Sequence, residues 1–270
     1  MYREGFIRHN NDNLVYLTIP SFDDTGLVRH CFTTRLGGVS RGCFRYLNLG
    51  FKKDDCHDHV MENYRRVCRQ LGINIKDLVL SDQVHGDSIR IVTEEDRGKG
   101  IVRPSDIKGV DGLVTNCNKV ALVTFYADCV PIFILDPVNG AVAVSHGGWK
   151  GTVRQIAAKT VSKMVDAYGT NPECCLAAIG PSIGPCCFEV DRPVAQRFYD
   201  AGYDNFIEKR DNKYHINLWA INAHQLVRSG IPTENITIAK ECTKCNNHIY
   251  FSHRGDNGRT GSLAAIIQLI

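Results

Sequence analysis

Short apolar runs rich in β-branched residues recur through the chain, and polar turn residues separate them. Runs of this length and composition predict β-strands, because their side chains can cover one or both faces of a sheet. The predicted strands are Leu14–Ile19, Leu27–Thr33, Ile89–Val92, Gly112–Thr115, Val120–Tyr126, Ile132–Leu135, Ala141–Ser145, Cys175–Ile179 and Ile236–Ala239. They cluster in the middle of the chain without strict alternation with helices. This order is typical of the α+β class, with mixed β-sheets and helices outside them.

Apolar residues recur at helical spacing in two segments. The clearest is Val153–Tyr168, where eight such positions fall on one face and Gly169 follows as a stop signal. A second helix is predicted from about His59 to Leu71, with Gly72 directly after it.

Two further helices are expected after Asp191 and Asn217. Either side chain can accept a hydrogen bond from a free amide in the first helical turn. No linker, internal repeat or low-complexity segment interrupts the pattern. We therefore predict one compact domain over residues 1–270, with helices outside mixed sheets.

Composition narrows the classes of function. The 32 basic and 29 acidic residues are well mixed and leave a net charge of +3, without the basic stripe that nucleic-acid binding requires. No apolar run reaches the ~18 residues of a membrane span, and the N-terminus has no segment typical of a signal peptide. We expect a cytoplasmic monomer or small homo-oligomer that binds neither nucleic acid nor membrane, with its 12 cysteines reduced.

Three residues stand in unusual local settings and together can form a metal site. They are His85 within QVHG, Cys129 within ADCVP and His146 at the start of HGGWKG. Two imidazoles and a thiolate suit Zn²⁺, and three protein ligands leave one coordination position open. A site of this kind indicates an enzyme.

The predicted strands bring two of these ligands near each other. Cys129 follows the strand that ends near Tyr126, and His146 follows the strand that begins at Ala141. The turn Asp136–Gly140 predicts a hairpin between them. His85 lies in a loop that would have to fold over this edge.

The glycine-rich turn Gly147–Gly151 predicts an anion site beside the metal. Amides at the start of a helix, with the cation of Lys150, suit a phosphate group. Arg35, in a similar turn, offers a second cation, and Asp128 offers a base next to Cys129. A tight strand-to-helix turn that needs glycine for its backbone angles explains the sequence equally well.

Several other patterns have simpler explanations. Taken alone, Cys129 is typical of a small buried apolar residue. Gly180–Gly184 matches a nucleophile elbow, but its prolines and the lack of a following helix favour a rigid loop that lines a pocket. Cys242 and Cys245 form a single C-x-x-C without a second pair, which is weak support for zinc or redox chemistry. His57 and His59 form the only H-x-H, too few ligands for a multicopper centre.

Nine motifs in this order make the chain resemble the YfiH-like laccase-domain family, also called polyphenol-oxidase-like or multicopper-oxidase-like proteins. In chain order they are TTRLGGVS at Thr33–Ser40, LNLG at Leu47–Gly50, QVHG at Gln83–Gly86, DGLVT at Asp111–Thr115, ADCVP at Ala127–Pro131, HGGWKG at His146–Gly151, IGPSIG at Ile179–Gly184, FSHR at Phe251–Arg254 and GRTG at Gly258–Gly261.

The resemblance implies a layered αββα fold and a zinc site at His85, Cys129 and His146. It implies purine nucleoside phosphorylase activity, and related enzymes also deaminate adenosine, cleave methylthioadenosine or oxidise phenols with copper. Within the matching motifs, four residues are expected to bind substrate or phosphate: Asn48, Gln83, Gly147 and Gly148. The chain departs from the family where Lys150 replaces the usual arginine, which loses bidentate phosphate geometry. It also departs at Asp54–His59, without a functional consequence that we can name.

Three hypotheses follow. The first is a zinc-dependent phosphorylase that splits adenosine, inosine, guanosine or methylthioadenosine into base and sugar 1-phosphate, with adenosine deamination at the same open metal position. Gly147 and Gly148, with Lys150 and Arg35, would hold the phosphate. The second is a metal-free cysteine hydrolase or deamidase in which Cys129 attacks. His146 would activate that thiol. The third is a binding protein without catalysis, and copper-dependent phenol oxidation is a further alternative.

Overall fold

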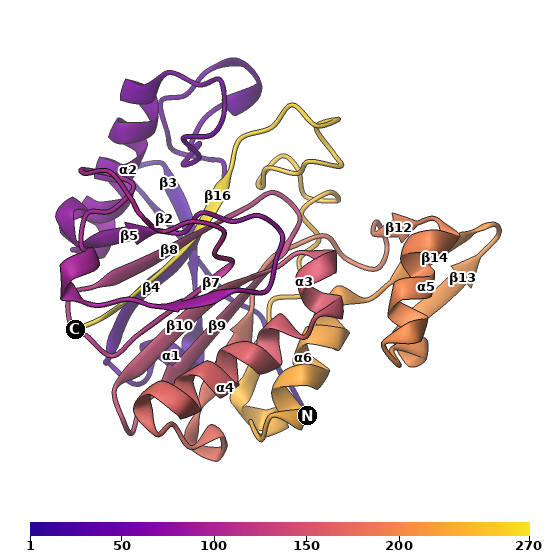
Figure 1. Ribbon diagram of the computed structural model, residues 1–270. Helices are drawn as coiled ribbons and strands as arrows, with labels where there is room; N and C mark the ends of the chain where they lie inside the picture. Colours follow the sequence, from indigo (N-terminus) through magenta and orange to yellow (C-terminus); the bar gives the residue numbers. More distant parts are fainter.

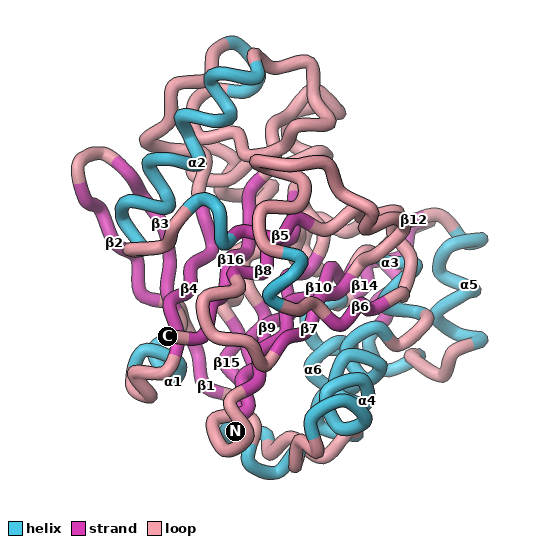
Figure 2. Tube along the Cα trace, turned by 60° about the vertical axis from the view of Figure 1, so that its left-hand side comes forward, coloured by secondary structure: helices cyan, strands magenta, loops and turns pink.

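Two large β-sheets lie face to face at the centre of the molecule (Figures 1 and 2). The computed structural model describes all residues, 1–270. One sheet has seven strands, in the spatial order β1 (Arg3–Glu4), β15 (Ile236–Ile238), β11 (Leu176–Ile179), β9 (Val130–Asp136), β10 (Ala141–Gly147), β7 (Gly112–Thr115) and β6 (Ile89–Ile91). The other has six, in the order β2 (Ile7–Asn11), β3 (Leu14–Thr18), β4 (Val28–Thr33), β16 (Leu263–Leu269), β8 (Ala121–Tyr126) and β5 (Leu78–Leu80).

Helices cover the outer faces of both sheets. α2 (His57–Leu71) packs on the six-stranded sheet, and α3 (Trp149–Val153), α4 (Ile156–Tyr168) and α6 (Leu218–Arg228) pack on the seven-stranded sheet. α1 (Pro20–Asp23) is a single turn before β4, and α5 (Arg192–Asp200) lies outside both sheets. A third, three-stranded sheet forms a small lobe with α5 at the right of Figure 1, in the order β12 (Glu189–Val190), β14 (Lys213–Ile216) and β13 (Ile207–Arg210). No helix combines the length and apolar content that crossing a membrane requires.

Three apolar clusters fill the spaces between the layers, and strand alternation assigns residues to them. In β9, Ile132 and Ile134 face α4 and α6, while Phe133 and Leu135 face the other sheet. In β16, Ile266 faces α2, and the next residue, Ile267, points between the sheets. Successive side chains of a strand point to opposite faces, so these strands are apolar throughout. The layers are therefore helix, sheet, sheet, helix, and the predicted αββα arrangement with mixed sheets is confirmed.

Most predicted strands agree with the structure to within two residues at each end, and the helices after Asp191 and Asn217 are present. Asn217 accepts a hydrogen bond from the Ala220 amide at 3.0 Å, as a capping residue does. Asp191 makes no such bond, because its carboxylate pairs with Lys213 instead.

Two predictions need correction. The helix predicted at Val153–Tyr168 is two helices, because Gln155 has a left-handed backbone with φ of 64° and separates α3 from α4. The central strand β16 was not among the predicted strands. Its sequence LAAIIQL is buried on both faces, so it lacks the apolar–polar alternation that marks a half-exposed strand.

Two chain crossings between the sheets define where a site can form. The chain passes from β8 to β9 through residues 127–129, and from β5 to β6 through residues 81–88. β5 and β8 are parallel neighbours in one sheet, so both crossings leave that sheet at the same end. The predicted hairpin of β9 and β10 is confirmed, and its register pairs His146 with Pro131. Residues on both crossings and at the end of β10 therefore meet at one edge.

The packing between the sheets predicts a large cost for removing a central ring. Phe133 is fully buried there, and Phe133→Ala should lower the free energy of unfolding by about 3–5 kcal/mol, because the cavity cannot collapse in a layer held by two sheets. Urea unfolding measures the change. Val138→Ala, at a turn position that is 70% exposed, is the control and should change stability by less than about 0.5 kcal/mol. Equal effects from both variants would contradict this account of the core.

Candidate active site at the His–Cys–His cluster

His85, Cys129 and His146 converge at this edge, as predicted. The ligand atoms of the three side chains all lie within 4.8 Å of one another. The two imidazole rings are 4.9 Å apart between centroids and nearly perpendicular, at 79°. His146 is buried, Cys129 is partly buried and His85 is exposed, so the cluster opens toward solvent on the His85 side. The sequence prediction that these residues can share a metal therefore agrees with their positions.

The backbone around the cluster is unusual at two positions. His85 has φ of 59° and Asp128 has φ of 95°, the left-handed region that residues other than glycine seldom adopt. Each such residue costs of order 1–3 kcal/mol, and surrounding contacts must hold it in place. Both lie on the crossings between sheets, so the strained conformations are the ones that turn His85 and Cys129 toward His146.

A buried carboxylate, Asp111, fixes two of the three ligands. Its Oδ1 accepts a hydrogen bond from Nδ1 of His146 at 2.8 Å. Its Oδ2 accepts the amides of Gly86 at 2.8 Å and Val84 at 3.1 Å, which flank His85. The bond to Nδ1 leaves Nε2 of His146 free to face the cluster, as metal-binding histidines require. The local sequence does not reveal this role of Asp111, because a residue before a strand carries no sign of such a contact.

Gly148 allows the main chain to approach all three ligands. A Cβ at this position would lie 3.1 Å from Cδ2 of His85 and 3.4 Å from Sγ of Cys129. Any side chain would therefore push against the cluster. The first turn of α3 is held in a similar way, since a Cβ at Gly151 would lie only 2.6 Å from the carbonyl oxygen of Gly86. Close packing, against the ligands at Gly148 and against the Gly86 backbone at Gly151, thus explains these two glycines.

The cluster favours a charge-separated pair in the absence of metal. Burial alone would raise the pKa of the Cys129 thiol, but the charge and hydrogen bonds of the neighbouring histidines lower it from 9.0 to about 6. Burial would also lower the pKa of His146, yet the Cys129 thiolate and the Asp111 carboxylate raise it from 6.5 to about 9. At neutral pH the side chains are therefore a thiolate beside an imidazolium, two forms that stabilise each other.

A cavity of about 720 Å³ adjoins the cluster, a size typical of small-molecule sites. Its wall includes all three ligands together with aromatic side chains and cations. The aromatic residues are Phe51, Phe125, Tyr126, Trp149 and Phe188. The cations are Lys52, Lys53, Lys108 and Arg254. The arrangement offers planar apolar surfaces for a ring system and positive charge for an anion, beside a potential metal.

Asp128 and Gln83 lie on the cavity wall, and both are tied to the main chain around it. The Asp128 carboxylate accepts the Thr243 hydroxyl at 2.7 Å and the Arg254 amide at 2.7 Å. The Gln83 side chain forms two hydrogen bonds of 2.8 Å with the backbone of Phe125. These contacts hold the walls in place beside the cluster.

The structure does not bring three other predicted residues to this cavity. Asn48 is fully buried, where its side chain binds the amides of Gly50 and Ser262. Arg35 lies in a separate hollow, where it pairs with Asp256. Lys150 is exposed, with its Nζ over the Trp149 ring, 5.7 Å from the centroid.

The predicted phosphate cradle also differs from expectation. The Gly148 amide donates to the carbonyl oxygen of His146 at 3.1 Å, so it is not free for an anion. Gly147 is a residue of β10, and α3 has only five residues. The elbow-like segment Gly180–Gly184 forms a loop, and Ile183 within it lines the cavity, as the sequence analysis expected.

Comparison with known proteins agrees with this arrangement. The family model described as multi-copper polyphenol oxidoreductase laccase matches residues 29–270. The chain is 36% identical over 240 residues to purine nucleoside phosphorylase YlmD of Bacillus subtilis (strain 168), covering 87% of this chain and 86% of that protein. It is 36% identical over 238 residues to adenosine deaminase RL5 of an unknown prokaryotic organism, covering 85% and 90%.

Solved structures give the same result. The crystal structure of the Bacillus licheniformis hypothetical protein YfiH superposes with a TM-score of 0.91 at 35% identity, and the match covers 97% of this chain and 99% of that one. Sequence and fold therefore agree over nearly the whole chain, and the chain belongs to the YfiH-like, laccase-related family described as multi-copper polyphenol oxidoreductase laccase.

Proposed function

We propose that the chain is a zinc-dependent purine nucleoside phosphorylase that converts adenosine, inosine, guanosine or methylthioadenosine to the free base and a sugar 1-phosphate. The observation that carries the proposal is the His85–Cys129–His146 cluster at the wall of a cavity with aromatic and cationic residues. The similarity to a protein named purine nucleoside phosphorylase supports it.

The donor set supports zinc as the metal. Two imidazole nitrogens and a thiolate are ligands that Zn²⁺ prefers, and Asp111 supplies the second hydrogen bond that a zinc-binding histidine needs. Three protein ligands leave a coordination position open to the cavity, which is the pattern of catalytic zinc. When bound, the zinc would supply Lewis acidity to an oxygen of the phosphate or the sugar.

Different residues of the cavity wall suit different parts of the substrates. Rings such as Phe125 and Trp149 can stack against a purine, which buries a large planar surface. Lys53 and Lys108 also line the cavity, and neither forms an ion pair within the protein, so both can neutralise a phosphate. We therefore propose these cations for phosphate in place of Lys150 and Arg35, which lie outside the cavity.

Asp128 is proposed as a positioning residue of the site. Both of its carboxylate oxygens accept hydrogen bonds from the loop between residues 243 and 254. It thereby keeps that loop, with Arg254, against the cavity and keeps Cys129 turned toward the histidines. Each oxygen retains a second lone pair, so Asp128 can also accept a proton from a substrate that approaches it.

Adenosine deamination is a second candidate reaction for the same site. The similarity to a protein named adenosine deaminase RL5 supports it. Phosphorolysis and deamination of adenosine both require a bound purine nucleoside beside an open metal position. The products separate the two reactions, since deamination gives inosine and ammonia without phosphate.

Two alternatives use the same three residues in other ways. The pKa of about 6 for the Cys129 thiol favours a metal-free cysteine hydrolase, because a thiolate is the form that attacks. Two histidines and a cysteine are also ligands of copper, which is the metal in the family's descriptive name. X-ray absorption of the isolated protein distinguishes the three: zinc with nitrogen and sulfur ligands supports the proposal, copper with these ligands supports oxidation, and no metal bound by these three residues supports the cysteine mechanism.

Phosphate-dependent cleavage of inosine is the direct test. Protein loaded with zinc should convert inosine and phosphate to equal amounts of hypoxanthine and ribose 1-phosphate. Liquid chromatography measures both products. His146→Ala should lower the rate by more than about 100-fold, because loss of a ligand exceeds the effect of losing its supporting partner. His9→Ala, on edge strand β2 away from the cavity, is the matched control and should keep the full rate. Hypoxanthine that forms equally well without phosphate, or not at all, would refute the proposal.

Removing the Asp111 charge should weaken the metal site. In Asp111→Asn the side chain is neutral, and an NH₂ group that can only donate replaces one of the two accepting oxygens. Zinc affinity should therefore fall by about 10–100-fold, because the support of His146 is weakened. Competition with a coloured chelator measures the affinity. Asp87→Asn makes the same change in the loop that carries His85, where the carboxylate pairs with Arg154 and Lys159, and should bind zinc like the unaltered protein. Equal affinity in a folded Asp111→Asn protein would show that Asp111 does not support the ligands.

Zinc binding should release protons in a pH-dependent way. At pH 7.5, between the pKa values of about 6 for Cys129 and about 9 for His146, the thiol is already ionised and the imidazole is charged. Zinc requires neutral imidazole, so His146 must release about one proton. Below pH 6 the thiol is protonated too, so more protons are released and the affinity falls. Titration calorimetry in two buffers of different ionisation enthalpy gives the number of protons released. Zinc binding without proton release at pH 7.5 would contradict the charge-separated pair.

A further inference from the structure

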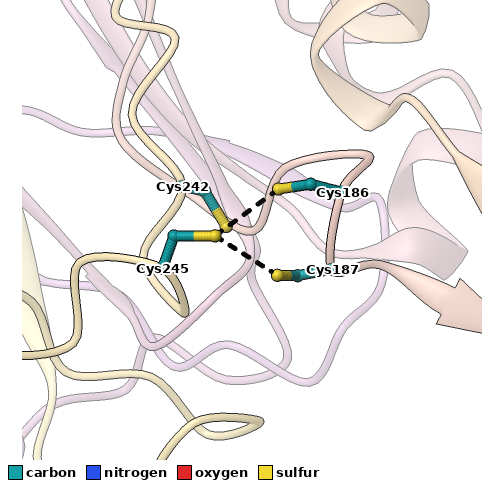
Figure 3. Close-up of side chains that lie close together, drawn as sticks. All are labelled: Cys186, Cys187, Cys242 and Cys245. Atoms are coloured by element: carbon teal, nitrogen blue, oxygen red, sulfur yellow. Dashed lines mark hydrogen bonds between the residues drawn. The ribbon is translucent and has the colours of Figure 1, made fainter.

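A second cluster of metal-binding side chains lies outside the His–Cys–His site. Cys186 and Cys187 lie in the loop between β11 and β12, and Cys242 and Cys245 lie in the loop after β15 (Figure 3). The four sulfur atoms all lie within 4.8 Å of one another. Sγ of Cys245 is 3.5 Å from Sγ of Cys187 and 3.7 Å from Sγ of Cys186. Residues almost sixty positions apart thus point their thiols at one centre.

We propose that Cys186, Cys187, Cys242 and Cys245 bind a second zinc ion in a closed tetrathiolate site. Four Zn–S bonds of ~2.3 Å arranged tetrahedrally place neighbouring sulfurs about 3.8 Å apart, close to the separations at Cys245. Four protein ligands leave no position for substrate, so this zinc is structural. In the sequence, the C-x-x-C of Cys242 and Cys245 has no second C-x-x-C pair and is only weak support for a zinc site. The fold supplies that pair from the adjacent cysteines of another loop.

Backbone contacts hold the two loops in position for this site. Ser182 and Cys242 form a parallel bridge, in which the Thr243 amide donates to the Ser182 carbonyl oxygen at 3.1 Å. The Gly184 amide donates to Sγ of Cys242 at 3.3 Å, a contact that stabilises a thiolate. A Cβ at Gly184 would lie 3.2 Å from Sγ of Cys186, so glycine allows the loop to close over the sulfurs. The four ligands are therefore arranged before any metal binds.

Simpler explanations account for only part of the cluster. A cysteine that acts as a small apolar residue is buried, which describes Cys242 but not Cys186 or Cys245, both of which are exposed. Disulfide bonds would join the sulfurs in two pairs, whereas Cys245 lies nearly equally far from two partners and is bonded to neither. One centre shared by four thiols is the arrangement of a metal site.

The proposed zinc would hold a wall of the active-site cavity. Thr243 lies between two of the ligands, and its hydroxyl donates to the Asp128 carboxylate at 2.7 Å. From the other loop, the Ile183 amide donates to the Asp128 carbonyl oxygen at 2.8 Å, and Ile183 lines the cavity. Asp128 precedes Cys129. Locking the two loops together therefore steadies the segment that carries the ligand Cys129, without contact between this zinc and substrate.

Metal content tests the proposal directly. Full-length protein isolated without chelator should contain about two zinc ions per chain by mass spectrometry, one in each site. Cys186→Ser/Cys245→Ser should lower the content to about one. Cys56→Ser/Cys174→Ser replaces two exposed cysteines outside the cluster and should leave it at about two. Equal zinc content in all three proteins would overturn the proposal.

X-ray absorption gives a second readout that does not depend on the cysteine variants folding. In His85→Ala/His146→Ala, which removes ligands of the first site only, the remaining zinc should have a shell of four sulfurs at ~2.3 Å and no nitrogen. Zinc in a nitrogen and oxygen shell, or no zinc, would overturn the proposal. So would a non-reduced mass that shows these four cysteines joined as disulfides. None of these readouts requires nucleoside turnover, so failure of the phosphorylase proposal would leave the result unchanged.

Discussion

The cluster of His85, Cys129 and His146 depends on one buried carboxylate. Asp111 directly precedes β7, and its two oxygens hold the imidazole of His146 from β10 and the amides on both sides of His85. Burying a charge is costly unless donors surround it, and here three donors do so. Those bonds keep the pKa of Asp111 below its usual range despite a burial that acts to raise it. The ligands are therefore placed by electrostatic contact with a rigid strand.

The layered fold explains why the site forms where it does. Two sheets packed face to face give a rigid body, and two of the passages between them, at residues 81–88 and 127–129, lie at the same end. Each passage carries one ligand, His85 or Cys129, and each has a left-handed residue that turns it inward. The third ligand, His146, ends the hairpin that begins beside Cys129. The sheets on both sides of these passages stabilise the strained backbone at His85 and Asp128. The loops can therefore hold the ligands in fixed positions.

Local patterns predicted the elements, and residues in distinctive motifs predicted the ligands. Helix stops at Gly72 and Gly169 were visible because a glycine after an amphipathic run has a local signature. Contacts between residues far apart in the sequence have no such local signature and could not be predicted. The partnership of Asp111 with His146 spans 35 positions and that of Cys186 with Cys245 spans 59, and no spacing rule encodes either. Lys150 illustrates the converse, since its place in a promising motif did not bring it into the cavity.

The two clusters of ligands differ in a way that matches two tasks. His85, Cys129 and His146 supply three ligands on strained backbone beside a cavity, which leaves room for a reacting molecule. The four-cysteine cluster supplies a full set on loops tied by backbone hydrogen bonds, outside the wall of the cavity. Asp128 connects them, because it precedes Cys129 and accepts the hydroxyl of Thr243 from the loop of the second cluster. A rigid closed site thus supports a strained open one, so the strain need not be stabilised by the sheets alone.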